Sequence, residues 1–259
     1  MDNRAIGVYD SGFGGLSVWD ELRWRLPHES LVYLGDGKNC PYGGRAKEEI
    51  AAFAFEAVER LVAEGVKMVV VGCNTATTAA IAELRERWPD MPIVGLEPAV
   101  KPACIGSRTR RIAVLATEHS LRSDMFLATA SRYASDVEVL KVVGEDFVEL
   151  VEEGMEQSEA ATIAVDRVVR PLLNEGVDKI VLGCTHYPFL RPLIERVVAG
   201  CGIDVIDSGE AVARRVEWLL ERYDIAASGD NEAYYSFISF ADEAYRERLE
   251  RRARVLMQR

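Results

Sequence analysis

Short apolar segments alternate with longer segments of helical periodicity along most of the chain. Each apolar run is short, rich in Val, Ile and Leu, and flanked by polar or turn residues, which is typical of buried strands in a parallel sheet. The predicted strands are residues 5–9, 31–34, 67–71, 93–96, 111–115, 137–142, 179–182 and 204–206. Helical spacing is clear in residues 48–64 and 162–174. This alternation predicts an α/β fold, with parallel sheet covered by helices on both faces.

A further β-rich run lies near the end of the chain. Residues 234–240 come after the turn-forming stretch Ser228-Gly229-Asp230-Asn231. We interpret this run as an edge strand.

The chain also contains an internal similarity. Residues 61–73 and 172–184 share seven of 13 positions at an offset of 111 residues, and both segments end in Gly-Cys. A weaker match relates residues 6–11 to 112–117 at an offset of 106 residues. The two offsets predict two related α/β halves. Ligands of open α/β sheets bind at the carboxyl ends of the strands, so facing halves would direct both terminal cysteines into one cleft.

Charge narrows the classes of partner. The 259 residues include 31 Lys and Arg against 42 Asp and Glu, a formal net charge of −11. Such an acidic chain is a poor general binder of nucleic acid or of anionic membrane. The arginine-rich segment 246–259 is interleaved with Glu247 and Glu250, which predicts a solvated helix face.

No segment has the properties of a targeting or membrane-spanning sequence. The first residues lack an apolar stretch, and the apolar runs are far shorter than the ~18 residues that cross a bilayer. We therefore expect a soluble, cytoplasmic protein. Five cysteines without short paired spacings indicate reduced thiols rather than a disulfide framework.

Cys73 and Cys184 are the strongest candidates for chemistry. Each ends a predicted strand and precedes a predicted helix start, with Asn74 and Thr75 as candidate caps after the first and Pro188 suited to the first helical turn after the second. A helix N-terminus favours a thiolate, and its N–H groups can hold a carboxylate. Buried structural cysteines remain an alternative. A zinc site is disfavoured because no Cys-x-x-Cys motif is present.

Two glycine-rich loops and one histidine complete the candidate site. Residues 10–15, DSGFGG, follow the first strand, and their glycines do not have the dinucleotide-binding spacing. Residues 35–45 form a long polar loop with four glycines, which suits a binding loop. His186 lies two residues after Cys184, where it could donate a proton or tune the thiol.

Six motifs in register resemble the glutamate racemases, which are PLP-independent. They are DSGFGGL at 10–16, NCPYG at 39–43, CNTA at 73–76, GLEPAVKP at 95–102, LGCTHYP at 182–188 and IDSG at 206–209. The resemblance implies an isomerase that interconverts L- and D-glutamate for peptidoglycan synthesis, and therefore for the cell wall and cell shape. It implies no cofactor and no metal, and it suggests a homodimer.

The resemblance also assigns residue roles. Two thiols act on opposite faces of the substrate α-carbon, Cys73 on D-glutamate and Cys184 on L-glutamate. Asp10 and His186 assist Cys73 and Cys184, respectively. The residues implied to bind substrate are Asp10, Ser11, Tyr42, Gly43, Asn74, Thr75, Thr185 and His186, with Glu152 and Ser120 also matched. The implied fold has two α/β domains, residues 1–97 plus 208–259 and residues 98–207, around an interdomain cleft.

The sequence departs from the family pattern at two places. His119 replaces a residue that is usually small, although Ser120 keeps a hydroxyl group, and the stretch 144–147 lacks the usual Cys-Pro. Two other functions stay open. One is a racemase of aspartate or another acidic amino acid, and the other is a non-catalytic amino-acid-binding or regulatory protein. Retention of both cysteines and of Asp10 disfavours the second.

Overall fold

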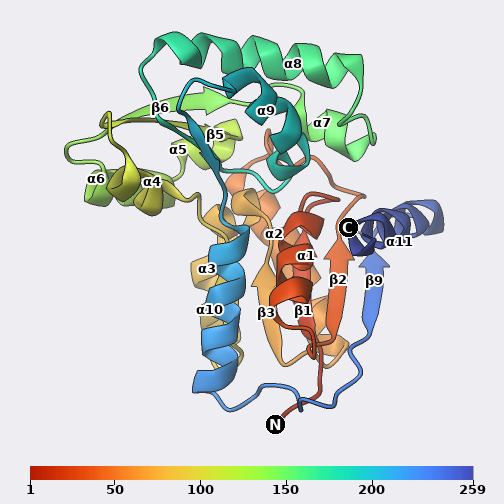
Figure 1. Ribbon diagram of the computed structural model, residues 1–259. Helices are drawn as coiled ribbons and strands as arrows, with labels where there is room; N and C mark the ends of the chain where they lie inside the picture. Colours follow the sequence, from red (N-terminus) through yellow and green to blue (C-terminus); the bar gives the residue numbers. More distant parts are fainter. Residues whose placement is uncertain (259) are drawn as a thin grey trace. The chain divides into compact units, whose positions relative to one another are not determined.

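Two parallel β-sheets, each covered by helices, organise the computed structural model, which describes residues 1–258 (Figure 1). One unit comprises Met1–Leu96 with Gly209–Arg259, and the other comprises Glu97–Ser208. This architecture confirms the predicted fold class of two parallel-sheet α/β domains. Among residues 1–258, no helix has both the length and the hydropathy required to cross a bilayer.

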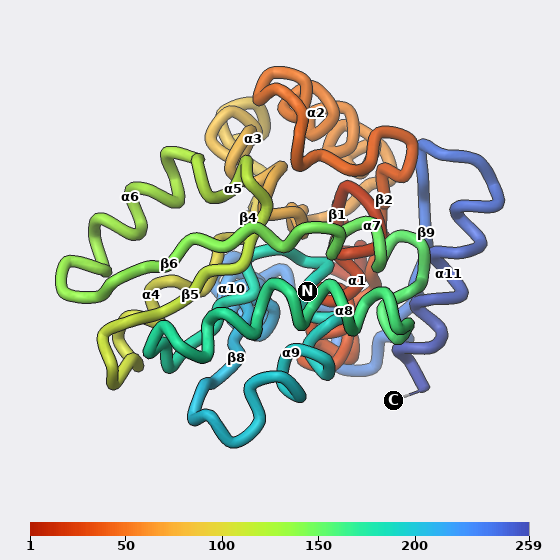
Figure 2. Tube along the Cα trace, turned by 90° about the horizontal axis from the view of Figure 1, so that it is seen from above, coloured from red at the N-terminus to blue at the C-terminus, as the bar shows by residue number. Residues whose placement is uncertain are grey.

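The first unit holds a five-stranded sheet of order β4-β3-β1-β2-β9, in which every neighbouring pair is parallel. Its elements are β1 (Ile6–Asp10), α1 (Leu16–Arg25), β2 (Leu31–Gly35), α2 (Lys47–Ala63), β3 (Met68–Val71), α3 (Asn74–Arg87), β4 (Ile93–Gly95), α10 (Gly209–Arg222), β9 (Tyr235–Ser239) and α11 (Glu243–Met257). Figure 2 shows α2 and α3 on one face of this sheet and α1 and α10 on the other. The late strand β9 pairs only with β2, which confirms the predicted edge strand.

The second unit holds a four-stranded parallel sheet of order β6-β5-β7-β8. Its elements are α4 (Val100–Gly106), β5 (Arg111–Ala116), α5 (Glu118–Arg122), α6 (Asp124–Tyr133), β6 (Glu138–Val143), α7 (Phe147–Glu152), α8 (Glu159–Val169), η1 (Arg170–Asn174), β7 (Lys179–Leu182), η2 (Tyr187–Leu190), α9 (Arg191–Val198) and β8 (Asp204–Ile206). The helix predicted over 162–174 is wrong in its second part, where the chain forms the 3-10 helix η1. Pro171 has no N–H to donate, so the α-helical ladder stops there.

Strand β5 illustrates why the apolar runs are continuous. Ile112, Val114 and Ala116 pack into one core together with α4 and α6. Ala113 and Leu115 face the opposite way, into a second core with α7, α8 and α9. Successive side chains of a strand alternate between faces, so a strand covered on both faces must be apolar at every position.

The internal similarity of the sequence corresponds to equivalent backbone pairing. In one sheet β1 pairs with β3 through Ile6 and Met68, and in the other β5 pairs with β7 through Ile112 and Lys179. These partners are related by the sequence offsets of 106 and 111 residues. Each unit is therefore built on the same central strand pair, in the same register.

Candidate active site

Cys73 lies at the carboxyl end of β3 and begins α3. The Gly72 N–H donates to the Tyr9 carbonyl oxygen over 2.6 Å, which joins this strand end to β1. The Cys73 Sγ accepts a hydrogen bond from the Ala76 N–H at 3.4 Å, so the cysteine itself caps the helix. The sequence instead suggested Asn74 or Thr75 as the cap, which was wrong because the thiol lies one residue nearer the strand. The N-terminal N–H of α3 stabilises negative charge on this sulfur.

Asp10 and Ser11 lie beside Cys73 at the end of the adjacent strand β1. The Cys73 thiol donates to the Ser11 hydroxyl, with 3.6 Å between Sγ and Oγ. Asp10 is completely buried, and its Oδ1 accepts the Gly12 N–H at 2.8 Å. A Cβ atom on Gly15 would lie 2.5 Å from the Asp10 Cβ, so only glycine lets the loop close this tightly. The structure therefore places two of the predicted residues, Asp10 and Ser11, at the strand end next to Cys73, and Ser11 contacts its sulfur.

The loop after β2 is held from inside by Asp36. Its carboxylate accepts hydrogen bonds from the Asn39 side chain and from the Tyr42 hydroxyl, the latter at 2.6 Å. The Tyr42 hydroxyl also lies 2.8 Å from that of Tyr9. Burial raises the pKa of both tyrosines, so their hydroxyls stay protonated and able to donate. Of the two predicted residues in this loop, Tyr42 is buried and Gly43 is half-buried.

Asn74 and Thr75 form the first turn of α3, and both side chains are almost completely buried. Among the described residues, no group accepts a hydrogen bond from the Asn74 Nδ2. A buried amide donor left without a partner costs about 1–3 kcal/mol, so native proteins rarely retain one without a reason. A bound carboxylate would satisfy this donor.

Cys184 occupies the equivalent position at the end of β7. The Gly183 N–H donates to the Leu115 carbonyl oxygen at 2.7 Å, as Gly72 does to Tyr9 in the other unit. The following helix is different, however, because η2 is a four-residue 3-10 helix that begins three residues after Cys184. The expectation that each thiol lies at a helix N-terminus is therefore right for Cys73, whereas Cys184 lies two residues before the N-cap of a short 3-10 helix. Pro188 lies in the first turn of η2, as predicted.

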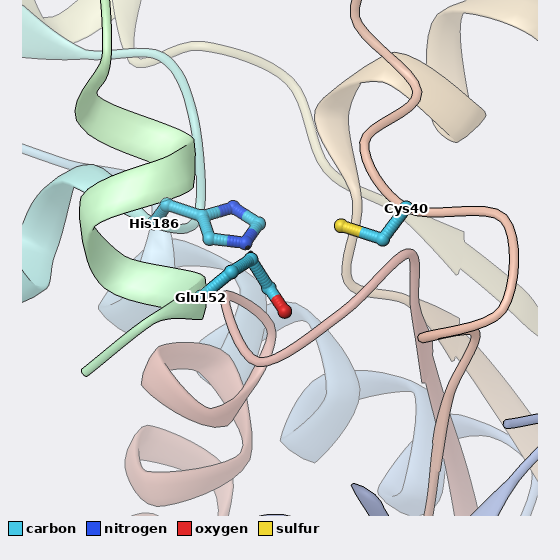
Figure 3. A group of neighbouring side chains, drawn as sticks. All are labelled: Cys40, Glu152 and His186. Atoms are coloured by element: carbon cyan, nitrogen blue, oxygen red, sulfur yellow. Dashed lines mark hydrogen bonds and ion pairs between the residues drawn. The ribbon is translucent and has the colours of Figure 1, made fainter. Parts of the chain in front are cut away.

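His186 connects the Cys184 sulfur to a carboxylate. The His186 Nδ1 lies 3.7 Å from the Cys184 Sγ. On the other side of the ring, the Nε2 lies 2.6 Å from the Glu152 Oε1, and Figure 3 shows these two side chains next to each other. Burial by itself lowers the pKa of this histidine, but the hydrogen bonds to Cys184 and Glu152 outweigh it, and the pKa is raised well above its usual value. The two hydrogen bonds thus favour the protonated imidazole beside the sulfur.

The other predicted residues of the second unit are also placed. Thr185 is buried next to Cys184, and Ser120 is completely buried in α5, the helix that follows β5. The Ser120 hydroxyl accepts a hydrogen bond from the Thr117 hydroxyl at 3.0 Å. His119 is half-buried in the same helix.

Sequence reasoning missed three residues at these strand ends. Tyr9 and Asp36 were overlooked, although Asp36 follows β2 directly and the rule that ligands bind at strand ends could have identified it. Phe13 was passed over because an aromatic residue between glycines gives no sign of its partner. That partner comes from α11, more than 200 positions further along the chain.

Two α/β units, each with a cysteine at the end of its central strand pair, are the features to compare with known proteins. Residues 20–216 match the family model of the Asp/Glu/hydantoin racemases. The chain belongs to the Asp/Glu/hydantoin racemase family.

Within this family the chain is similar to glutamate racemases over most of its length. It is 47% identical over 223 residues to the glutamate racemase of Ectopseudomonas mendocina, covering 86% of this chain and 84% of that one. It is 44% identical over 245 residues to that of Herpetosiphon aurantiacus, covering 95% and 96%. Among solved structures, Bacillus anthracis glutamate racemase RacE1 superposes with a TM-score of 0.87 at 32% identity, over 97% of this chain and 94% of that one.

A further solved structure carries a ligand. Escherichia coli glutamate racemase, in complex with L-glutamate and the activator UDP-MurNAc-ala, superposes with a TM-score of 0.85 at 32% identity, over 98% of this chain and 95% of that one.

Proposed function

We propose that this protein is a glutamate racemase that uses two cysteines and no cofactor. The observation that carries the proposal is the equivalent placement of Cys73 and Cys184, each after a Gly whose N–H closes the central strand pair of its unit. Inversion of a stereocentre requires loss of a proton on one face and gain of a proton on the other. Two thiols supplied by two related units meet that requirement.

The proposed reaction balances protons between the two sulfurs. The Cys73 thiolate removes the α-proton of D-glutamate and becomes a thiol, and the Cys184 thiol then delivers its proton to the opposite face and becomes a thiolate. The product is L-glutamate, and the reverse direction exchanges the roles. The α-proton beside a carboxylate is weakly acidic, so placement and hydrogen bonding must stabilise the carbanionic transition state.

The surroundings of each thiol support a distinct role. On the first unit, the Ala76 N–H and the Ser11 hydroxyl contact the Cys73 sulfur, and Asp10 immediately precedes Ser11. On the second unit, His186 is positioned by Glu152 to stabilise the Cys184 thiolate or to return its proton. We propose that substrate carboxylate and amino groups bind to the residues that the family motifs indicate, namely Ser11, Tyr42, Gly43, Asn74, Thr75, Ser120 and Thr185. The Asn74 amide supports this because it is a buried donor still available to a ligand.

Glutamate is the proposed substrate because the relatives that match most of the chain are glutamate racemases, one of them solved with L-glutamate. We further propose that the product D-glutamate serves peptidoglycan synthesis and that the enzyme works as a cytoplasmic homodimer.

The test is racemisation by the purified protein without added cofactor. L- and D-glutamate should each lose optical rotation, and deuterium from heavy water should appear at the α-carbon. Cys73→Ala and Cys184→Ala should each abolish racemisation, whereas Cys201→Ala, which removes an exposed thiol, should keep it. Full turnover by Cys73→Ala would refute the two-thiol mechanism. Deuterium incorporation into aspartate alone would show that the substrate is the shorter acid.

A further inference from the structure

Helix α11 packs one of its faces against the loops that begin at the ends of β1 and β2. Tyr245, Leu249 and Arg252 are three or four positions apart, so they project from the same side of the helix. Leu249 is completely buried, and a Cβ atom on Gly35 would lie only 3.0 Å from one of its methyl carbons. The sequence predicted this arginine-rich segment as a solvated helix face. Arg248, Arg251 and Arg254 are exposed, as predicted, whereas Leu249, Ala253 and Leu256 form a buried side of the same helix.

Phe13 is the contact point in the first loop. Its ring is completely buried and stacks on the Tyr245 ring, with centroids 4.6 Å apart and planes inclined by 17°. The guanidinium carbons of Arg248 and Arg252 lie 5.1 and 5.0 Å from the centre of the Phe13 ring. One stacking contact and two cation–π contacts, all from side chains of α11, therefore hold the Phe13 ring.

The position of Phe13 links this contact to the thiol. Only Gly12 separates Phe13 from Ser11, whose hydroxyl accepts the hydrogen bond of Cys73. The Gly12 N–H is fixed by Asp10, and its carbonyl oxygen accepts the Tyr33 hydroxyl at 2.7 Å. A shift of Phe13 would thus be transmitted through a short, hydrogen-bonded segment to Asp10 and Ser11.

The loop after β2 also contacts the Tyr245 ring. A Cβ atom on Gly37 would lie 2.3 Å from an atom of the Tyr245 ring, so only glycine allows the backbone to lie against it. Gly37 follows Asp36, whose carboxylate holds Asn39 and Tyr42. Tyr245 therefore contacts both loops of the first unit that carry candidate substrate-binding residues.

We propose that Tyr245, together with Arg248 and Arg252, positions the Asp10–Ser11 segment for proton transfer at Cys73. These are positioning residues, because they act through Phe13 and Gly37 and not on the substrate itself. This positioning role rests on the proposed function. If the wild-type protein does not racemise glutamate, the proposed function is refuted. The variants described next test the positioning role alone.

The experiment compares Tyr245→Leu, which removes the ring, with Tyr245→Phe, which keeps it. We expect Tyr245→Leu to lower kcat/KM about tenfold or more and Tyr245→Phe to stay within about twofold of wild type. The matched control is Tyr223→Leu, because Tyr223 is an exposed tyrosine of the same unit that lies outside both loops. It should also stay within about twofold.

Isotope effects separate positioning from a general loss of structure. With 2-deuterated D-glutamate, proton removal by Cys73 becomes more strongly rate-limiting in Tyr245→Leu, so the primary isotope effect on kcat/KM should rise. With 2-deuterated L-glutamate, removal by Cys184 becomes less limiting, so the effect should fall. A partly unfolded enzyme would lower both rates without changing either isotope effect.

A second variant keeps the test valid if Tyr245→Leu does not fold. Arg248→Gln with Arg252→Gln changes side chains at the helix surface and should shift both isotope effects in the same directions, to a smaller extent. Its control is Arg251→Gln with Arg254→Gln on the exposed side of α11. Unchanged isotope effects in a folded Tyr245→Leu protein would overturn the positioning role. If Tyr245→Leu does not fold, unchanged isotope effects in the Arg248 and Arg252 double variant would overturn it.

Discussion

Cys73 and Cys184 end equivalent strands, yet different groups stabilise negative charge on the two sulfurs. Cys73 receives a backbone N–H from the first turn of a 14-residue α-helix. Cys184 precedes only a short 3-10 helix and has the buried imidazole of His186 instead. The two sulfurs occupy equivalent backbone positions, but the residues that follow each strand give them different electrostatic surroundings.

Asn74 provides a prediction that separates ligand binding from stability. Because its buried Nδ2 has no acceptor among the described residues, Asn74→Ala should leave the free energy of unfolding unchanged or raise it slightly. It should reduce kcat/KM for glutamate by roughly 10- to 100-fold, the equivalent of about 1.4–2.7 kcal/mol, as expected for a lost hydrogen bond to a charged group. Steady-state kinetics and urea unfolding measure the two effects. The control is Asn174→Ala at an exposed position, and a destabilised Asn74→Ala protein would contradict the ligand-donor role.

The His186–Glu152 pair predicts a pH-dependent stability. The pKa of His186 is raised in the folded protein, so its stabilising effect is complete below its unfolded pKa of about 6.5 and is lost as pH rises through the folded value. Glu152→Gln should therefore reduce the free energy of unfolding by about 1.5–3 kcal/mol at pH 6, and by less at alkaline pH.

Urea unfolding of Glu152→Gln at several pH values tests this pair. Glu153→Gln is the matched control, because that neighbouring carboxylate is exposed. An equal loss of stability at pH 6 and at alkaline pH would show that the histidine charge does not contribute.

At the scale of elements, strand ends are brought together by glycines that admit close backbone approach. Gly72 and Gly183 occupy the same place in their units, and a Cβ atom on either would lie 3.2 or 3.1 Å from the carbonyl oxygen of the neighbouring strand. Each cysteine is thereby held directly beside the end of the central strand. The loops after β1 and β2 in turn contact α11, a helix that begins more than 200 residues later in the sequence.

Gly15 tests how tightly the β1–α1 connection must close. In Gly15→Ala the new methyl group would meet Asp10 and the Tyr33 hydroxyl, at 2.5 and 2.9 Å, so the loop must shift. We expect a loss of about 1–3 kcal/mol in stability, as for other overpacked sites, together with at least a tenfold loss of kcat/KM. Gly229→Ala is the control, because nothing lies within 4 Å of its Cβ position. Thermal unfolding and kinetics measured on the same samples decide the outcome; wild-type activity in Gly15→Ala would contradict it.

At the scale of the whole molecule, each of the two units carries one cysteine at the end of the same central strand pair. The register is equivalent in β1–β3 and β5–β7, so the two units share one arrangement of their central strands. In the proposed mechanism each face of the α-carbon needs its own thiol, so the proposed activity belongs to the complete chain.

Substrate binding without turnover gives a prediction for the complete chain. In a Cys73→Ala, Cys184→Ala double variant, glutamate should bind without being racemised and should stabilise the folded state by about 2.7 kcal/mol at a concentration 100 times Kd. Thermal unfolding with increasing L- or D-glutamate measures this, with L-lysine as a cationic control of similar size. Equal shifts with lysine would show that the stabilisation is not specific.

Sequence patterns by themselves determined the parallel α/β class, the strands, the internal repeat and the two candidate thiols. These features follow from local information: strands buried on both faces must be apolar throughout, and strand ends are marked by Gly-Cys. The tertiary structure alone decided that Cys73 caps its own helix, that Asp36 holds Tyr42, that Glu152 orients His186, and that Tyr245 stacks on Phe13. Side-chain contacts between residues far apart in the chain depend on the packing of whole elements, and no local pattern encodes them.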